Sequence, residues 1–276
     1  MLRKSPSPCL GVGEGCPEHI FTGFSRPAGS WCYSRWRCET RSGTDLPQTG
    51  DGHPVDFLFD DSALPREPRQ LRPGAWHVPG WLSPEMQSWI INRFFEWGNG
   101  PVPPHQTLVN GHPMSVQSLC LGWHWSPSSY SRTADDINGA PVAPMEPWLV
   151  ELGRRAVRDA TGDPVKAQSY RPDAAIVNYY DVNATMGMHQ DAEERINAPV
   201  VSLSLGDSST FRMGNTEHRN RPWQEVRLAS GDLFVFDGPA RFAYHGVTRI
   251  HPGTAPQGCG LGSGRINITL RQTGLS

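Results

Sequence analysis

Hydrophobic residues change their spacing along the chain, and the change predicts the helices before residue 171 and most of the strands after it. From Ser83 to Gly98, apolar residues recur every three or four positions, which is typical of an amphipathic helix with a serine N-cap. A second helical run covers 147–160, and Gly162 is suited to end it. We expect both helices to turn their apolar faces towards a common core.

Shorter segments with alternating hydrophobicity predict the strands. After residue 171, Gly and Asp turn residues separate eight of them, which suits a sandwich or a jelly roll. The turn Ser230-Gly231-Asp232 lies between two apolar runs and predicts a hairpin. Before residue 171, Leu71–Trp81 predicts an entering strand, and Met114–Trp125 predicts a hairpin. The eight expected strands are 174–180, 186–191, 200–205, 210–213, 225–228, 233–236, 241–245 and 265–271.

The composition is that of an ordinary globular chain with a biased beginning. Of the 276 residues, 37% are hydrophobic and 19% are charged, and no apolar run reaches the ~20 residues that a membrane helix needs. We therefore expect a cytoplasmic protein with no membrane partner, and we expect a monomer. Residues 1–55 are rich in Gly, Pro, Ser and Arg, and we expect them to form a disordered N-terminal extension.

The cysteines do not indicate one specific metal site. Four of the six lie in the first forty residues, and their spacing matches no common zinc module. A small metal site formed by Cys9, Cys16 and His19 is one interpretation. Reduced thiols in an unstructured leader are the simpler one.

The charge of the chain bears on its partners. A formal net charge of −2 argues against a general nucleic-acid binder, because such proteins usually carry a basic excess. Contacts with phosphate would then have to come from a local cluster. The run His218-Arg219-Asn220-Arg221 is the best candidate.

His189-x-Asp191 is the only His-x-Asp sequence of the chain, and it lies in an expected strand. Residues two apart in a strand point to the same face with Cα atoms ~7 Å apart, so both side chains can reach one ion. His245 lies in a later expected strand. Two histidines and one carboxylate with open positions suit non-haem Fe(II), because a co-substrate and O2 must also reach the metal. The alternative is that His245 is a hydrogen-bonded core histidine.

The last expected strand, 265–271, alternates strictly between apolar and polar residues. One interpretation is a half-exposed strand with a solvated polar face. The other is a polar wall inside a barrel, where arginines bind a dicarboxylate through bidentate charge-assisted bonds. Because 2-oxoglutarate is the dicarboxylate that such an iron site needs, the upstream motif favours the second interpretation. The polar positions are Arg265, Asn267, Thr269 and Arg271.

These motifs, in this order, resemble the AlkB family of Fe(II)/2-oxoglutarate-dependent dioxygenases. The resemblance covers residues 76–274 and is densest after residue 171. The Arg-x-Asn-x-Thr-x-Arg ending is its most specific motif. The other matching blocks are Asn178-Tyr179-Tyr180, His189-Gln190-Asp191, the segment 198–206, Ser230-Gly231-Asp232 and Tyr244-His245-Gly246.

The resemblance implies an α+β, mainly β fold. Its core would be a double-stranded β-helix (jelly roll), with N-terminal helices and a substrate-binding lid. Residues 1–55 would be the extension, residues 56–170 the nucleotide-recognition lid with its supporting helices, and residues 171–274 the dioxygenase domain.

The resemblance also implies a role for individual residues. Trp123 would stack on a flipped base opposite the ring of His189, with core packing as the alternative, because the chain has ten tryptophans. Tyr130 would touch the nucleic-acid backbone, Glu193 the edge of the base, and Arg219 the substrate. The iron ligands would be His189, Asp191 and His245. The residues that hold 2-oxoglutarate would be Asn178, Tyr180, Arg265, Asn267 and Arg271, with Ser202 and Thr269 lining the pocket.

The activity that the resemblance implies is oxidative demethylation of N-alkylated bases, of the 1-methyladenine and 3-methylcytosine type, in DNA or RNA. It would use Fe(II), O2 and 2-oxoglutarate and release succinate, CO2 and formaldehyde. A base stacked in a duplex is unreachable, so the target would flip out or come from a single strand. Two alternatives stay open. The same iron chemistry could act on a tRNA, a protein or a small molecule, and a non-catalytic β-barrel could hold zinc with the same three residues.

Overall fold

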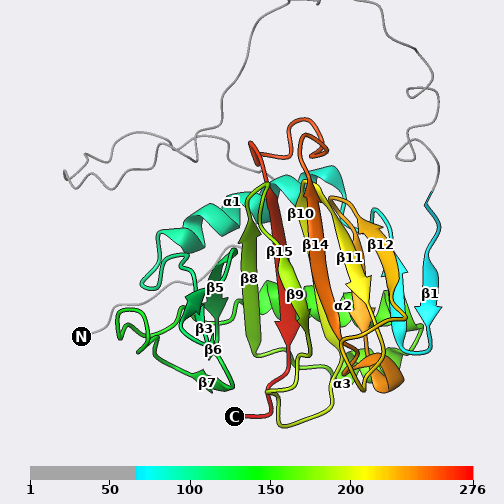
Figure 1. Cartoon of the computed structure of the whole chain (residues 1–276), viewed down its shortest axis with the longest axis horizontal. Helices are drawn as coiled ribbons and strands as arrows, with labels where there is room; N and C mark the ends of the chain where they lie inside the picture. The colour runs from blue at the N-terminus through cyan, green and yellow to red at the C-terminus, as the bar shows by residue number, and fades with distance from the viewer. Residues whose placement is uncertain (1–65, 276) are drawn as a thin grey trace, which may run out of the picture. The chain divides into compact units, whose positions relative to one another are not determined.

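The computed structural model describes residues 66–275. Most strands of this part belong to two antiparallel sheets, one of seven strands and one of four. Buried side chains of both sheets meet between them, as the rings of Phe211 and Phe234 do at a centroid distance of 4.9 Å. This arrangement confirms the expected mainly β, jelly-roll architecture (Figure 1).

The seven-stranded sheet is assembled from distant parts of the chain. Its strand β15, drawn in red in Figure 1, pairs with β8 along its whole length and with β10 along all but its last residue. The first strands of the described chain form one edge and β5 forms the other, so the segment before residue 171 shares this sheet with the segment after it. In sheet order the strands are β1 (Arg69–Arg72), β2 (Ala75–Val78), β13 (Leu233–Phe236), β10 (Val200–Gly206), β15 (Arg265–Arg271), β8 (Ala174–Tyr180) and β5 (Gln117–Leu121).

The four-stranded sheet lies opposite and is formed by the second half of the chain. Its strands, in sheet order, are β12 (Gln224–Leu228), β11 (Ser208–Met213), β14 (His245–His251) and β9 (Met186–His189). Two small hairpins complete the β structure of the described residues. They are β3 (Leu108–Val109) with β4 (His112–Pro113), and β6 (His124–Ser126) with β7 (Ser129–Ser131).

Two long helices pack behind the seven-stranded sheet in Figure 1. Helix α1 (Pro84–Gly98) begins at Ser83, whose hydroxyl accepts a hydrogen bond from a backbone N–H of the first turn. It packs on the sheet where Phe94 meets Tyr179 of β8, at 6.4 Å between ring centroids.

Helix α2 (Pro147–Thr161) ends at Gly162, which adopts the left-handed conformation with φ of +70°. Both predicted helices are therefore confirmed, and the sequence analysis did not predict the short helix α3 (Pro164–Ser169) that follows. One apolar residue departs from the expected pattern: Trp89 of α1 is 44% exposed.

Of the eight strands expected after residue 171, seven were predicted correctly and one was wrong. Three expected strands, 174–180, 233–236 and 265–271, have the predicted bounds, and four more differ by one or two residues at an end. The expected strand 241–245 is absent, because a 3-10 turn at Gly238–Ala240 and an irregular segment occupy this place, and β14 begins only at His245. The side chains of residues 241–244 alternate between buried and partly exposed, as in a strand, but these residues belong to no strand of either sheet.

Both predicted hairpins were wrong, although the chain does turn at each place. The turn at Ser230–Asp232 connects β12 to β13, which belong to different sheets. Similarly, β5 and β6 lie in different sheets, and Gly122 between them takes a positive φ of +79°. A Cβ at Gly122 would lie 2.0 Å from the carbonyl oxygen of Asp173, so the close backbone approach requires glycine there.

Two predictions cannot be compared with the structure. The leader at 1–55 and the metal site from Cys9, Cys16 and His19 both lie outside the described residues. Among residues 66–275, no helix is long and apolar enough to cross a bilayer.

Candidate active site

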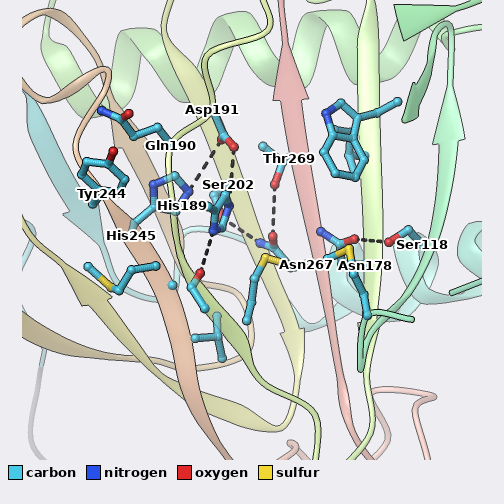
Figure 2. A pocket seen from close by; sticks show the side chains of 18 of the residues that line it. Ser118, Asn178, His189, Gln190, Asp191, Ser202, Tyr244, His245, Asn267 and Thr269 are labelled. Atoms are coloured by element: carbon cyan, nitrogen blue, oxygen red, sulfur yellow. Dashed lines mark hydrogen bonds and ion pairs between the residues drawn. The ribbon is translucent and has the colours of Figure 1, made fainter. Parts of the chain in front are cut away.

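Three potential metal ligands converge where β9 and β14 pair. His189 ends β9 and His245 begins β14, and the antiparallel register sets these two residues opposite each other. Nε2 of His189 lies 3.6 Å from Oδ1 of Asp191, and Nε2 of His245 lies 3.7 Å from Oδ2. The three side chains turn towards one another in Figure 2, and their ligand atoms lie within 4.8 Å of one another. They are therefore close enough to bind one ion.

Both imidazoles are held with Nε2 towards the aspartate. Nδ1 of His189 lies 2.9 Å from the carbonyl oxygen of Gly187, and Nδ1 of His245 lies 2.9 Å from that of Ala243. A carbonyl only accepts hydrogen bonds, so Nδ1 carries the proton and the lone pair of Nε2 is free for a metal. Such supporting contacts are typical of metal-binding histidines.

The charges at the site also suit a metal. Burial lowers the pKa of His245 to about 4, and the neighbouring His189 acts in the same direction. Burial by itself would raise the pKa of Asp191, but Arg271 and the two imidazoles outweigh it and lower the pKa to about 2. At neutral pH the site therefore offers a neutral imidazole and an ionised carboxylate, which are the protonation states that bind metals.

A buried ionic network holds Asp191 from the other side. Nη2 of Arg271 donates to Oδ1 of Asp191 at 2.6 Å, while Nη1 donates to Tyr130 and to Glu194, both at 3.1 Å. The Tyr130 hydroxyl donates to Glu194 at 2.6 Å, and Arg241 donates to the second oxygen of Glu194 at 2.7 Å. Glu194 is thus the shared partner of two arginines and one tyrosine.

Glu194 and Arg241 are two site residues that were not predicted from the sequence. Glu194 follows directly after Glu193, and nothing local distinguishes the two carboxylates. Their surroundings do: the side chain of Glu194 is buried, whereas that of Glu193 is partly exposed and lies 3.8 Å from Arg271. Burial by itself would raise the pKa of Glu194, but the Arg271 charge and the hydrogen bond from Tyr130 outweigh it and lower the pKa, so Glu194 stays ionised.

Arg265 is a buried cation on the inner face of β15. Only 1% of its surface is exposed, and Nη2 donates to the Ser204 hydroxyl at 2.9 Å. Nε and Nη1 make no hydrogen bond to any described residue, and the same holds for Nε of Arg271. Burial lowers the pKa of Arg265, and no carboxylate of the described chain forms an ion pair with it to offset this effect. Two inward-facing guanidinium groups with free N–H donors fit the two ends of a small dicarboxylate.

Polar side chains of neighbouring strands surround these arginines. Asn267 donates to the Ser202 hydroxyl at 2.7 Å, and Thr269 donates to Asn267 at 3.1 Å. Ser118 of β5, which the sequence analysis missed, donates to Asn178 at 2.6 Å across the sheet. All seven residues of β15 are buried, so the polar face belongs to the interior and the half-exposed alternative is wrong (Figure 2).

These groups line one cavity of about 600 Å³, a size common for small-molecule sites. Glu193 and Arg219, the residues expected near the substrate, lie on its wall together with Tyr244 and Trp125. The expected metal and 2-oxoglutarate residues that line it are Asn178, Tyr180, His189, Asp191, Ser202, His245, Arg265, Asn267, Thr269 and Arg271.

Two residues expected at the substrate lie elsewhere. Trp123 is not on the cavity wall: its indole N–H donates to Asp173 at 3.2 Å, and the Arg132 guanidinium lies 3.6 Å from its ring centroid. Trp125, two residues later on β6, lines the cavity in its place. Tyr130 pairs with Trp125 across the hairpin, and its hydroxyl belongs to the Arg271 network.

The chain is similar to known oxygenases in sequence and in structure. Residues 74–271 match the profile of the 2OG-Fe(II) oxygenase superfamily. Over 212 residues the chain is 36% identical to the alpha-ketoglutarate-dependent dioxygenase AlkB homolog of Caulobacter vibrioides, covering 75% of this chain and 90% of that protein.

Relatives with more specific names are similarly close. The DNA N(6)-methyladenine demethylase ALKBH1D of Arabidopsis thaliana is 32% identical over 222 residues, or 73% of this chain and 50% of that protein. The tRNA demethylase abh1 of Schizosaccharomyces pombe is 34% identical over 185 residues, or 60% of each. The solved structure of OsALKBH1 superimposes with a TM-score of 0.65 at 31% identity, covering 74% of this chain and all of that one.

Proposed function

Since the chain belongs to the AlkB family of the 2OG-Fe(II) oxygenase superfamily, we propose that it removes alkyl groups oxidatively from nitrogen atoms of nucleic-acid bases. The bases that suit it best are those of the 1-methyladenine and 3-methylcytosine type, in DNA, with RNA as the second substrate class. Membership of an oxygenase family sets aside the non-catalytic zinc-holding module. Fe(II), 2-oxoglutarate and O2 are the cofactor and co-substrates of this enzyme.

One observation carries the proposal: a His-Asp-His ligand set lies beside two buried arginines in a single cavity. We assign His189, Asp191 and His245 to the iron. Arg271 reaches Asp191 directly, so it lies next to the metal position, whereas Arg265 lies further along β15. We therefore assign one carboxylate of 2-oxoglutarate to each arginine, with Tyr180, Asn178 and Asn267 as further polar contacts.

When bound, the iron with O2 and 2-oxoglutarate supplies the oxidising chemistry, in which one oxygen atom leaves in succinate and the other hydroxylates the N-alkyl carbon, with loss of CO2. The resulting N–CH2OH group of a cationic base loses formaldehyde and a proton, which restores the unsubstituted ring nitrogen. The part of the protein is to orient these groups and to exclude water from them. Glu194 contributes by fixing the guanidinium of Arg271, which in turn fixes the carboxylate of Asp191.

The cavity wall supplies contacts that suit a cationic damaged base. Trp125 and Tyr244 offer aromatic faces, and Glu193 offers a carboxylate. Both kinds of group favour a ring that alkylation has made positive. A flipped base can enter such a cavity, and an alkylated base flips more cheaply because it pairs poorly. Residues 56–170 would then serve as lid and support, and residues 171–274 as the oxygenase core.

The test is a mass-spectrometric demethylation assay on DNA and RNA oligonucleotides carrying 1-methyladenine or 3-methylcytosine. The expected result is loss of 14 mass units per methyl group, together with succinate, only when Fe(II) and 2-oxoglutarate are both present. A His189→Ala variant controls for contaminating oxygenases. Succinate release driven by a protein or a small molecule, with the oligonucleotides unchanged, would replace the nucleic-acid proposal with that alternative.

A further inference from the structure

The four-stranded sheet has a second face that the proposed active site does not use. Along β11, Phe211 and Met213 are buried towards the core, so the intervening Thr210 and Arg212 point outward. The same reasoning applies to the flanking strands. Arg227 of β12 is exposed between the buried Val226 and Leu228, and Arg249 of β14 is exposed next to the buried Ile250.

Two of these arginines flank one threonine. The register pairs Thr210 with Arg227 on one side and with Arg249 on the other. Adjacent strands lie ~4.8 Å apart, so the two arginines begin about 10 Å apart on the same face. His251 joins them, since its Nε2 lies 2.9 Å from the Thr210 hydroxyl. Within the described chain, no carboxylate forms an ion pair with either arginine.

The cationic face continues to the cavity. Arg219 lines the cavity and belongs to the loop that joins β11 to β12. Two guanidinium groups lie over the ring of Trp223 in this loop. That of Arg212 is 4.1 Å from the ring centroid, and that of Arg221 is 5.3 Å from it. Arg212 stands next to Thr210 on the outward side of β11, so arginines follow one another from the cavity wall to the Arg227 and Arg249 pair.

The charge balance of this region differs from that of the whole chain. Residues 208–228 and 245–251 contain five arginines against two glutamates, a local excess of +3 in a chain whose net charge is −2. One of the two glutamates, Glu225, is already paired with Arg212. Like charges gathered on one face repel one another, and a polyanion with regularly spaced charges relieves this repulsion.

We propose that the outward face of β12, β11 and β14 binds the phosphodiester backbone of the nucleic acid whose damaged base occupies the cavity. This inference rests on the proposed function and adds a binding surface outside the cavity. Arg227 and Arg249 are its central contacts, with Thr210 between them, and Arg219 and Arg221 lead from it to the cavity. β12, β11 and β14 lie side by side at the right of Figure 1.

The test compares two double variants with the same change in charge. Arg227→Gln/Arg249→Gln removes the central contacts. Arg155→Gln/Arg158→Gln is the matched control, because these exposed arginines lie on α2, behind the other sheet. Binding of a fluorescent 20-nucleotide single strand with one 3-methylcytosine is measured by anisotropy, and demethylation is measured on this strand and on a trinucleotide.

Loss of two phosphate contacts should raise the Kd of the long strand roughly tenfold at 50 mM salt. At 200 mM salt the ratio of the variant's Kd to that of the unchanged protein should be about sevenfold smaller than at 50 mM. The reason is that each single-strand contact contributes about 0.7 to the slope of log K against log salt concentration. The trinucleotide has only two phosphodiester groups and lacks the longer backbone that this face would bind. The double variant should therefore demethylate it as fast as the unchanged protein does. Arg227→Lys/Arg249→Lys should retain most of the binding.

An unchanged Kd and salt slope in Arg227→Gln/Arg249→Gln would overturn the inference, as would an equal loss in the α2 control. Failure of the proposed function looks different. In that case the unchanged protein itself would demethylate neither the long strand nor the trinucleotide.

Discussion

Replacing Arg265 with Met should separate the stability of the fold from the binding of 2-oxoglutarate. Arg265 is 1% exposed, and two of its N–H donors have no partner among the described residues. An unpaired buried cation costs free energy in the ligand-free protein. Methionine has a similar length without the charge, so Arg265→Met should leave the ligand-free protein as stable as before or about 1–4 kcal/mol more stable.

The loss of ligand binding follows from the same two donors. A hydrogen bond to a charged group is worth about 1.5–3 kcal/mol, so two of them amount to about 3–6 kcal/mol. Since about 1.4 kcal/mol corresponds to a factor of ten, the Kd for 2-oxoglutarate should rise at least a hundredfold. The two effects have opposite signs, and a purely structural role for Arg265 would not produce that combination.

Thermal unfolding with Mn(II) in place of Fe(II), so that no turnover occurs, measures both effects. At a concentration of a hundred times Kd, 2-oxoglutarate should stabilise the unchanged protein by about 2.7 kcal/mol, which raises Tm by about 5–11 °C. In the variant, the same concentration is at most about equal to the raised Kd, so the stabilisation should be at most about 0.4 kcal/mol and the shift in Tm less than about 2 °C.

Arg241→Met provides the contrast, because Arg241 is equally buried but is paired with Glu194. Breaking that pair should lower the free energy of unfolding by about 3–5 kcal/mol. The reasoning is refuted if Arg265→Met destabilises the ligand-free protein to the same degree and still shows the full shift in Tm with 2-oxoglutarate.

Three further outcomes are expected. His189→Ala should abolish succinate release while Tm of the metal-free protein falls little, because this side chain is 35% exposed; residual turnover measured with labelled 2-oxoglutarate would contradict the ligand assignment. Burial opposes ionisation of Asp232, but hydrogen bonds from His77 and Arg66 outweigh it and lower its pKa below 3.8, so its contribution to stability is present above about pH 4 and is lost as the pH falls through the folded-state value. Urea unfolding should therefore show that Asp232→Asn is less stable than the unchanged protein at pH 7, and that the difference in the free energy of unfolding becomes smaller below pH 4. A difference that does not change with pH would argue against this linkage. Trp125→Ala should raise KM for a methylated oligonucleotide several-fold without changing KM for 2-oxoglutarate, whereas Trp123→Ala should mainly lower Tm, and the reverse result would restore the stacking role to Trp123.

Local patterns were sufficient for much of the fold. The strict alternation of 265–271 and the apolar runs at 174–180 and 233–236 predict strands with the observed bounds. The caps at Ser83 and Gly162 mark where helices begin and end. These features depend on residues within a few positions of one another, which is why a sequence read alone can reveal them.

Strand partners were harder to predict, because pairing depends on segments far apart in the chain. The turns at Gly122 and Gly231 are real, yet the two strands that each turn joins belong to different sheets and do not pair with each other. The expected strand 241–245 shows the same difficulty, since alternation between buried and partly exposed side chains arises in a turn as well as in a strand.

The sequence by itself determined the chemistry of this protein: two histidines, one aspartate and two arginines of the kinds that iron and a dicarboxylate need, at spacings that put the arginines on one side of a strand. Only the tertiary structure decided which other residues complete the site. It brought Glu194 to Arg271, 77 positions away, and Ser118 to Asn178, 60 positions away, and it put Trp125 on the cavity wall instead of Trp123. The physical reason is that ligand chemistry belongs to each side chain, whereas burial and contact depend on how distant strands pack against one another.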